Sequence, residues 1–214
     1  MRRLTHLLLS PPSRFVRLLL GEKRLSYDSV VPEDPHVHLP AFEDTDGTRC
    51  TGVWAIVDHL EASYEDNPMV PEDAGARGET LRLLDWAMGP LYESVTRKVV
   101  YEKAAQRATG AQGGHAPNME TVRQGREALK PVLKMLGDAA DLNGYLVARD
   151  CALGDLAVAA HLSALDYFGE VPWTDFPSAA EWYLRMKSRP SFRSLLSDRV
   201  SGQPPVSHYG QLDD

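Results

Sequence analysis

Residues 4–25 read LTHLLLSPPSRFVRLLLGEKRL, and this stretch predicts how the fold begins. The apolar run from Leu4 to Leu9 is short and ends at Ser10-Pro11-Pro12, so it predicts a buried strand that stops at a turn. A helix is expected from Ser13, because apolar residues then recur at helical spacing. Its charged residues are expected on the solvent-facing side: Arg14, Arg17, Glu22 and Lys23.

The spacing of the apolar residues then changes several times before residue 66. Strands are predicted over Ser26 to Val31, Leu39 to Asp44 and Thr48 to Thr51, with a hairpin turn at Asp46-Gly47. Helical spacing returns from Val53 to Tyr64. The predicted order in this half is strand, helix, strand, strand, strand, helix.

Beyond this half the pattern is helical. Residues Asn67 to Gly78 hold two prolines and two glycines and are predicted to be a linker. A long helix is expected around Leu81 to Val99, bent at Gly89-Pro90. A second long helix is expected to begin after Asn118 as its N-cap. Because Leu153 to Phe168 is apolar on nearly every side, it is expected to be the buried central helix.

Composition and charge exclude several classes of protein. The 214 residues are 43% hydrophobic and 25% charged, which predicts a folded chain. A net charge of −7 gives no general attraction to nucleic acid or anionic lipid. We expect a cytoplasmic protein without membrane insertion, because no signal-peptide core or spanning segment is present. The only two cysteines, Cys50 and Cys151, are far apart and are expected to be free thiols.

Several motifs together resemble the glutathione transferases. Residues 10–17, SPPSRFVR, followed by GEKRL at 21–25, are similar to the start of that family. Leu39-Pro40 looks like its cis-proline dipeptide, and Gly154-Asp155-Leu156-Ala157 looks like the segment where an aspartate caps the central helix. The resemblance implies an α/β thioredoxin-like domain at 1–66, a linker at 67–78, an all-α domain at 79–199 and an extended tail at 200–214.

The resemblance also implies where glutathione would bind. Ser10 has the position of the hydroxyl that stabilises the thiolate, although it also suits a helix N-cap. Leu39, before Pro40, offers backbone groups to the cysteinyl part. Gly52 and Val53 fall where the family has an acid and a hydroxyl for the γ-glutamyl group, and neither can pair with a charge. The short segment Pro32 to His38 lacks room for a bordering helix. We therefore expect a vestigial site that binds glutathione weakly or not at all.

One branch of the family resembles this chain most, on the GEK motif, the short stretch before Leu39-Pro40 and the PP…HY ending at 204–209. These are transferase-like cell-division proteins of alphaproteobacteria that bind the tubulin-like filament protein FtsZ. The resemblance implies a non-catalytic homodimer that regulates constriction and is recruited to the division site. Ordering an extended acidic peptide on binding costs little free energy, so the partner surface is expected in the tail. The residues expected there are Tyr209, Gln211, Leu212, Asp213 and Asp214.

The alternative function is a glutathione-dependent transferase or isomerase acting on small electrophiles, with Ser10 as the catalytic hydroxyl. A redox protein is disfavoured because Ser10 and Ser13 stand where a cysteine pair would be. A metal site at His36-x-His38, with Glu33, Asp34 or Asp46 added, is less expected than surface histidines.

The remaining candidates are expected to be structural. Asp155 is expected to cap the central helix without a Ser or Thr at the N-cap position, which is Ala152. Cys50 and Cys151 are expected to be small buried residues. The tryptophans are expected to pack in the core, although Trp54 and Trp86 also suit an interface.

Overall fold

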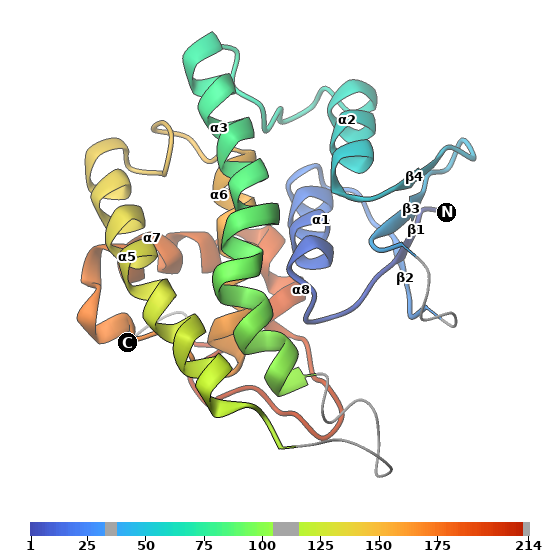
Figure 1. Cartoon of the computed structure of the whole chain (residues 1–214). Helices are drawn as coiled ribbons and strands as arrows, with labels where there is room; N and C mark the ends of the chain where they lie inside the picture. The colour runs from blue at the N-terminus through green and yellow to red at the C-terminus, as the bar shows by residue number, and fades with distance from the viewer. Residues whose placement is uncertain (33–37, 105–115, 212–214) are drawn as a thin grey trace.

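The computed structural model describes residues 1–32, 38–104 and 116–211 of the chain. A small sheet with two helices forms the first half, and helices form the second (Figure 1). One continuous set of buried apolar side chains runs through both halves, from Leu4 in the sheet to Tyr209 near the end of the chain. The two halves therefore share a core.

The sheet is mixed and has the order β2-β1-β3-β4. Strand β1 (Arg3–Thr5) pairs in parallel with β2 (Asp28–Val30) and antiparallel with β3 (Ala41–Glu43), which pairs with β4 (Arg49–Thr51). The order of strands and helices is the predicted one. The predicted strand from Leu4 to Leu9 is too long, because β2 and β3 pair with Arg3–Thr5 alone.

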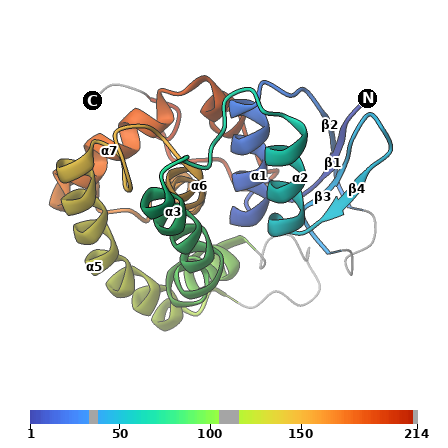
Figure 2. The ribbon, with the colours of Figure 1, turned by 90° about the horizontal axis from the view of Figure 1, so that it is seen from above.

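Both helices of the first half lie on the side of the sheet that faces the helical half (Figure 2). Helix α1 (Pro11–Glu22) stands between the sheet and the second half, and α2 (Val53–Ser63) lies beside it. The prediction of a solvent-facing side for α1 is wrong. All four charged residues assigned to that side are buried: Arg14, Arg17, Glu22 and Lys23.

These buried charges are paired, which offsets the cost of removing them from water. Asp198 accepts hydrogen bonds from Arg17 at 2.8 Å and from Arg14 at 3.2 Å. Glu22 accepts from Arg189 at 2.7 and 2.9 Å. Ion-pair partners near the end of the chain thus allow the charged residues of α1 to be buried. The local spacing of residues in α1 cannot reveal these distant partners.

The second half is built on long helices. Helix α3 (Ala74–Trp86) begins inside the predicted linker, because Asp73 caps it by accepting from the Ala76 amide at 2.8 Å. It continues into η1 (Ala87–Tyr101), whose wider π-type turns contain Pro90. Helix α5 (Met119–Asn143) starts after Asn118, whose side chain caps it as predicted. The shorter elements near the end are η2 (Trp173–Asp175), α7 (Pro177–Lys187), η3 (Pro190–Phe192) and α8 (Arg193–Leu196).

Helix α6 (Leu153–Tyr167) is the centre of the helical half, and every one of its residues is buried, as predicted. The Asp155 carboxylate accepts hydrogen bonds from the Ala152 amide at 3.1 Å and from the Leu146 amide at 2.9 Å. It also accepts from the Trp182 indole at 3.0 Å. Asp155 therefore caps α6 and ties it to the loop before it and to α7.

Close packing of α5 on η1 depends on Gly125. A Cβ at this position would lie 2.7 Å from Val99 Cγ2 and 3.1 Å from the Val95 carbonyl oxygen. We expect Gly125→Ala to lower the free energy of unfolding by about 1–3 kcal/mol through overpacking. Urea denaturation measures this change.

Gly78→Ala is the matched control, because position 78 is exposed within α3 and a Cβ there meets nothing within 4 Å. Alanine is the better helix former, so this variant is expected to be unchanged or up to about 1 kcal/mol more stable. Equal stability of the two variants would show that α5 and η1 are not packed this closely.

Among the described residues, none of the helices combines the length and the apolar character that crossing a membrane requires.

Candidate functional site

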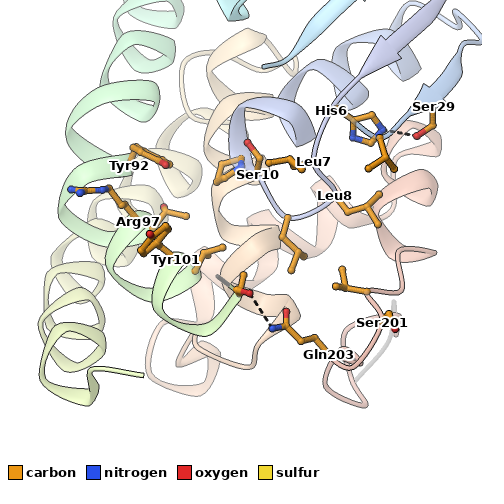
Figure 3. Close-up of a pocket in the computed structure, with 17 residues that line it drawn as sticks. His6, Leu7, Leu8, Ser10, Ser29, Tyr92, Arg97, Tyr101, Ser201 and Gln203 are labelled. Atoms are coloured by element: carbon orange, nitrogen blue, oxygen red, sulfur yellow. Dashed lines mark hydrogen bonds between the residues drawn. The ribbon is translucent and has the colours of Figure 1, made fainter. Parts of the chain in front are cut away.

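A cavity of about 650 Å³ lies between the two halves. Residues 6–11 and the end of β2 form one side, residues 92–104 of the helical half form another, and residues 200–203 close an end. Figure 3 shows Tyr92, Arg97 and Tyr101 on one side and His6 and Leu8 on the other. Most of the lining is apolar, so the cavity suits a small apolar molecule.

Ser10 is the predicted site residue that lines this cavity. It occupies the N-cap position of α1, but its hydroxyl makes no capping hydrogen bond. The backbone there is held by the Ser10 amide, which donates to the Leu7 carbonyl at 3.2 Å. The Ser10 side chain therefore does not cap α1, and its hydroxyl is available to a bound molecule.

The other predicted site residues lie together but do not line the cavity. The Leu39–Pro40 bond is cis, as the family resemblance implies. The Gly52 amide donates to the Pro40 carbonyl at 2.9 Å, which brings the two predicted segments side by side. Gly52 precedes α2 with φ +85°, a conformation that favours glycine. Beside it, Val53 is buried and Trp54 is 45% exposed.

The residues expected to meet the γ-glutamyl end of glutathione are Gly52 and Val53, at the start of α2. Gly52 and Val53 carry no polar side-chain group, and the N-terminus of α2 has no side-chain cap. An ammonium placed there without a partner would lose roughly 1–3 kcal/mol for each missing contact. A carboxylate can still accept from the backbone N–H groups at the N-terminus of α2.

The predicted metal ligands do not form a site among the residues described. Glu33, Asp34 and His36 lie outside them, and so does most of the segment from Pro32 to His38. His38 is exposed. Within ranges 1–32, 38–104 and 116–211, no group of three or more candidate ligands is close enough to hold a metal ion.

Both cysteines are free thiols, half-buried rather than fully buried. Burial, together with the negative charges of Asp44 and Asp46, raises the pKa of the Cys50 thiol. Burial also raises the pKa of Cys151, whose sulfur lies 4.0 Å from that of Met186. Thiols with raised pKa values are poor nucleophiles near neutral pH, so neither is a candidate for catalysis.

Tyr209, which is expected at the partner surface of the tail, lies in the core instead. Its side chain is fully buried, and its ring packs edge-on against Tyr167 at 5.2 Å. Its hydroxyl donates to the Leu195 carbonyl at 3.1 Å and accepts from Arg14 at 2.8 Å. Tyr209 therefore anchors the tail, whereas Gln211 is exposed and Leu212, Asp213 and Asp214 lie outside the described residues.

Sequence reasoning also missed two buried histidines. His6 lines the cavity and shares a hydrogen bond of 2.7 Å with Ser29. His161, in the middle of α6, shares one of 2.9 Å with Thr96. Burial lowers the pKa of His161 to about 3 and, with the nearby charge of Arg17, that of His6 to about 4. Both imidazoles are therefore neutral near pH 7, and no sequence pattern distinguishes them from surface histidines.

Known proteins share this architecture along the whole chain. Residues 4–68 match the family model described as glutathione S-transferase, N-terminal domain. The chain is 38% identical to FtsZ-localized protein A of Caulobacter vibrioides, over 99% of this chain and 98% of that protein. It therefore belongs to the glutathione S-transferase-like family that includes FtsZ-localized protein A.

Solved structures agree with this membership. The structure of FzlA from C. crescentus superposes with a TM-score of 0.94 at 36% identity, covering 100% of this chain and 99% of that one. A glutathione S-transferase from Rhodospirillum rubrum F11 gives a TM-score of 0.94 at 37% identity, with both chains covered completely. The predicted glutathione-transferase fold is confirmed.

Proposed function

We propose that this chain is a non-catalytic interaction protein that binds FtsZ filaments and regulates constriction in bacterial cell division. The observation that carries the proposal is its similarity, over nearly its whole length, to a protein named for its localisation to FtsZ. The unsuitable γ-glutamyl position at Gly52 and Val53 supports the absence of catalysis. The protein acts in the cytoplasm, recruited to the division site, as a homodimer.

Co-sedimentation with polymerised FtsZ tests this function. We expect the full-length protein to pellet with filaments in a saturable manner at micromolar concentration. Protein that stays in the supernatant at these concentrations rejects the proposal. Sedimentation velocity on the protein alone tests the homodimeric state. A monomer at those concentrations would reject the homodimer.

We propose that the part of the tail after Tyr209 forms a portion of the partner surface. Gly210 and Gln211 are exposed, and the last two residues of the chain are aspartates. Tyr209 itself is buried, so it serves as the anchor from which this peptide extends.

Two truncations separate anchoring from binding. Removal of residues 211–214 is expected to leave the free energy of unfolding unchanged within about 0.5 kcal/mol and to weaken filament binding about tenfold. Removal of residues 209–214 also deletes the buried ring, and is expected to cost about 3–5 kcal/mol of stability. Urea denaturation and pelleting measure the two effects. Normal pelleting by the shorter truncation would exclude the tail from the interface.

The second candidate function is a glutathione-dependent transferase or isomerase acting on small electrophiles. The observation that favours this function is the Ser10 hydroxyl, which makes no capping hydrogen bond and lies beside an apolar cavity. This function requires a thermal shift with excess glutathione and conjugation of chlorodinitrobenzene that Ser10→Ala abolishes. The absence of both the thermal shift and the conjugation would exclude this second function.

A further inference from the structure

Strand β4 is an edge of the sheet, and its outer side has no neighbouring strand among the described residues (Figure 2). On its inner side, the Gly52 amide donates to the Pro40 carbonyl at 2.9 Å in the ladder with β3. Because ladder bonds alternate along an antiparallel pair, Cys50 is the residue of β4 that bonds to β3. The backbone N–H and C=O groups of Arg49 and Thr51 therefore point to the open side.

These outward groups are unpaired. Within ranges 1–32, 38–104 and 116–211, no hydrogen bond reaches the backbone N–H or C=O of Arg49 or Thr51. Sheet edges are commonly guarded by a proline, a bulge or a charge. Strand β4 has no proline and pairs with β3 without a bulge, and the charge of Arg49 is already paired with Glu43 at 3.3 Å. The edge is short, but it is open to a further strand.

An exposed aromatic side chain stands next to this edge. Trp54 follows β4 by three residues, in the first turn of α2, and is 45% exposed. Tryptophan is enriched among the residues that anchor protein interfaces. The edge thus combines unpaired backbone groups with an apolar side chain that gains from being covered.

The edge is complementary to a second copy of itself. In an antiparallel pairing centred on Cys50, Arg49 of one copy lies opposite Thr51 of the other, and both direct their backbone groups outward. About four ladder hydrogen bonds then satisfy all of these groups. A shift of one residue would oppose outward groups to inward ones. A shift of two would bring the two Arg49 side chains together or leave their backbone groups unpaired, so the symmetric register is favoured.

We propose that two copies of this chain pair through β4 in this symmetric register, which joins their sheets into one continuous sheet. The proposal rests on the proposed homodimer and names its interface. Continuation of the register brings Trp54 of each copy close to the Asp46-Gly47 turn of the other. The association thus removes apolar surface from water in addition to completing the ladder.

The native thiols report this pairing directly. Cys50 lies at the centre of the register, where antiparallel strands bring the two Cα atoms about 4.5 Å apart, within the span that a disulfide bridges. Oxidation in air with copper phenanthroline, at about pH 8.5 to ionise more of the thiols, is expected to yield a disulfide-linked dimer on a non-reducing gel. Cys50→Ser is expected to abolish this product, and Cys151→Ser is the matched control that keeps it. A linked dimer that depends on Cys151 overturns the proposal.

Thr51→Pro tests the ladder without touching a thiol. Proline is tolerated at an edge position whose N–H faces outward, so the pairing of β3 with β4 is retained. The substitution is expected to weaken dimerisation at least about tenfold in sedimentation velocity and to prevent the Cys50 link. Thr51→Val keeps the N–H and the branched side chain and is expected to match the wild type. Thermal unfolding verifies that each variant is folded.

Trp54→Ser tests the apolar part of the interface with the ladder intact. We expect dimerisation to weaken about tenfold, because the covered ring is lost. Met135→Ser on α5 removes another exposed apolar side chain, 44% exposed, and is expected to leave dimerisation unchanged. Equal dimerisation by the two variants would exclude Trp54 from the interface and contradict the register.

Sedimentation velocity on the wild-type protein separates this interface from the homodimer itself. A dimer whose Cys50 thiols do not link, or one that keeps its affinity in Thr51→Pro, overturns the pairing through β4 and leaves the homodimer in place. A monomer at micromolar concentration rejects both. Pelleting of that monomer with FtsZ filaments would still support the proposed function.

Discussion

Acidification from pH 7 to pH 5 is expected to lower the free energy of unfolding by about 4 kcal/mol, because two buried histidines must remain neutral in the fold. In the unfolded chain His6 and His161 take up protons near their ordinary pKa of 6.5. In the fold their pKa values are lowered to about 4 and about 3. Between these values the unfolded state binds more protons, so stability falls as pH falls.

Urea denaturation at several pH values measures this effect as a slope of about 1.4 kcal/mol per pH unit for each histidine between pH 6 and 5. His161→Gln is expected to reduce the slope by that amount, whatever it does to stability at pH 7. Met135→Gln, on the exposed side of α5, removes no imidazole and is expected to leave the slope unchanged. A stability that does not change between pH 7 and 5 would contradict the burial of these rings.

Replacement of Arg14 by methionine is expected to lower the free energy of unfolding by about 3 kcal/mol. Methionine fills much of the space but cannot donate. The guanidinium is fully buried and donates to Leu8, Ser163, Tyr209 and Asp198. Without it, the Leu8 carbonyl loses its charged donor, and Asp198 keeps only Arg17. Buried acceptors without partners account for most of the expected loss.

Arg123→Met on α5 is the matched control for this substitution. Arg123 is 68% exposed and pairs with Glu120 on the surface, so its loss is expected to cost less than about 0.5 kcal/mol. Chemical denaturation of both variants gives the comparison. If Arg14→Met were as stable as Arg123→Met, the buried network would not hold the two halves and the tail together.

The elements that depend on local pattern were predictable from the sequence. The all-apolar run of α6, the capping side chain of Asn118 and the order of the strands all follow from short-range rules. The cis bond at Leu39-Pro40 does not, because most X-Pro bonds are trans, and only the family resemblance implied it.

The errors arose where partners are distant in sequence. Arg14 and Arg17 have the spacing of a solvent-facing side, yet Asp198 neutralises them from the far end of the chain. Tyr209 lies in a polar tail, yet it fills a space between Tyr167 and Arg14. Such pairs are set by tertiary contact, which a single sequence does not display.

The candidate site was predicted in part. Ser10 lines a cavity, and Gly52 lies next to Pro40. The contribution of residues 200–203 to the cavity was missed, because those residues were expected to form an extended tail. Because Tyr209 is buried and residues 200–203 line a cavity, this part of the tail is anchored to the rest of the molecule.

We propose that this fold acts through its outer surface and not through glutathione. Co-sedimentation isotherms with polymerised FtsZ, measured with and without millimolar glutathione, test it most directly. We expect the same saturable binding at micromolar concentration in both conditions. A protein that fails to pellet, or that pellets only when glutathione is present, would contradict it.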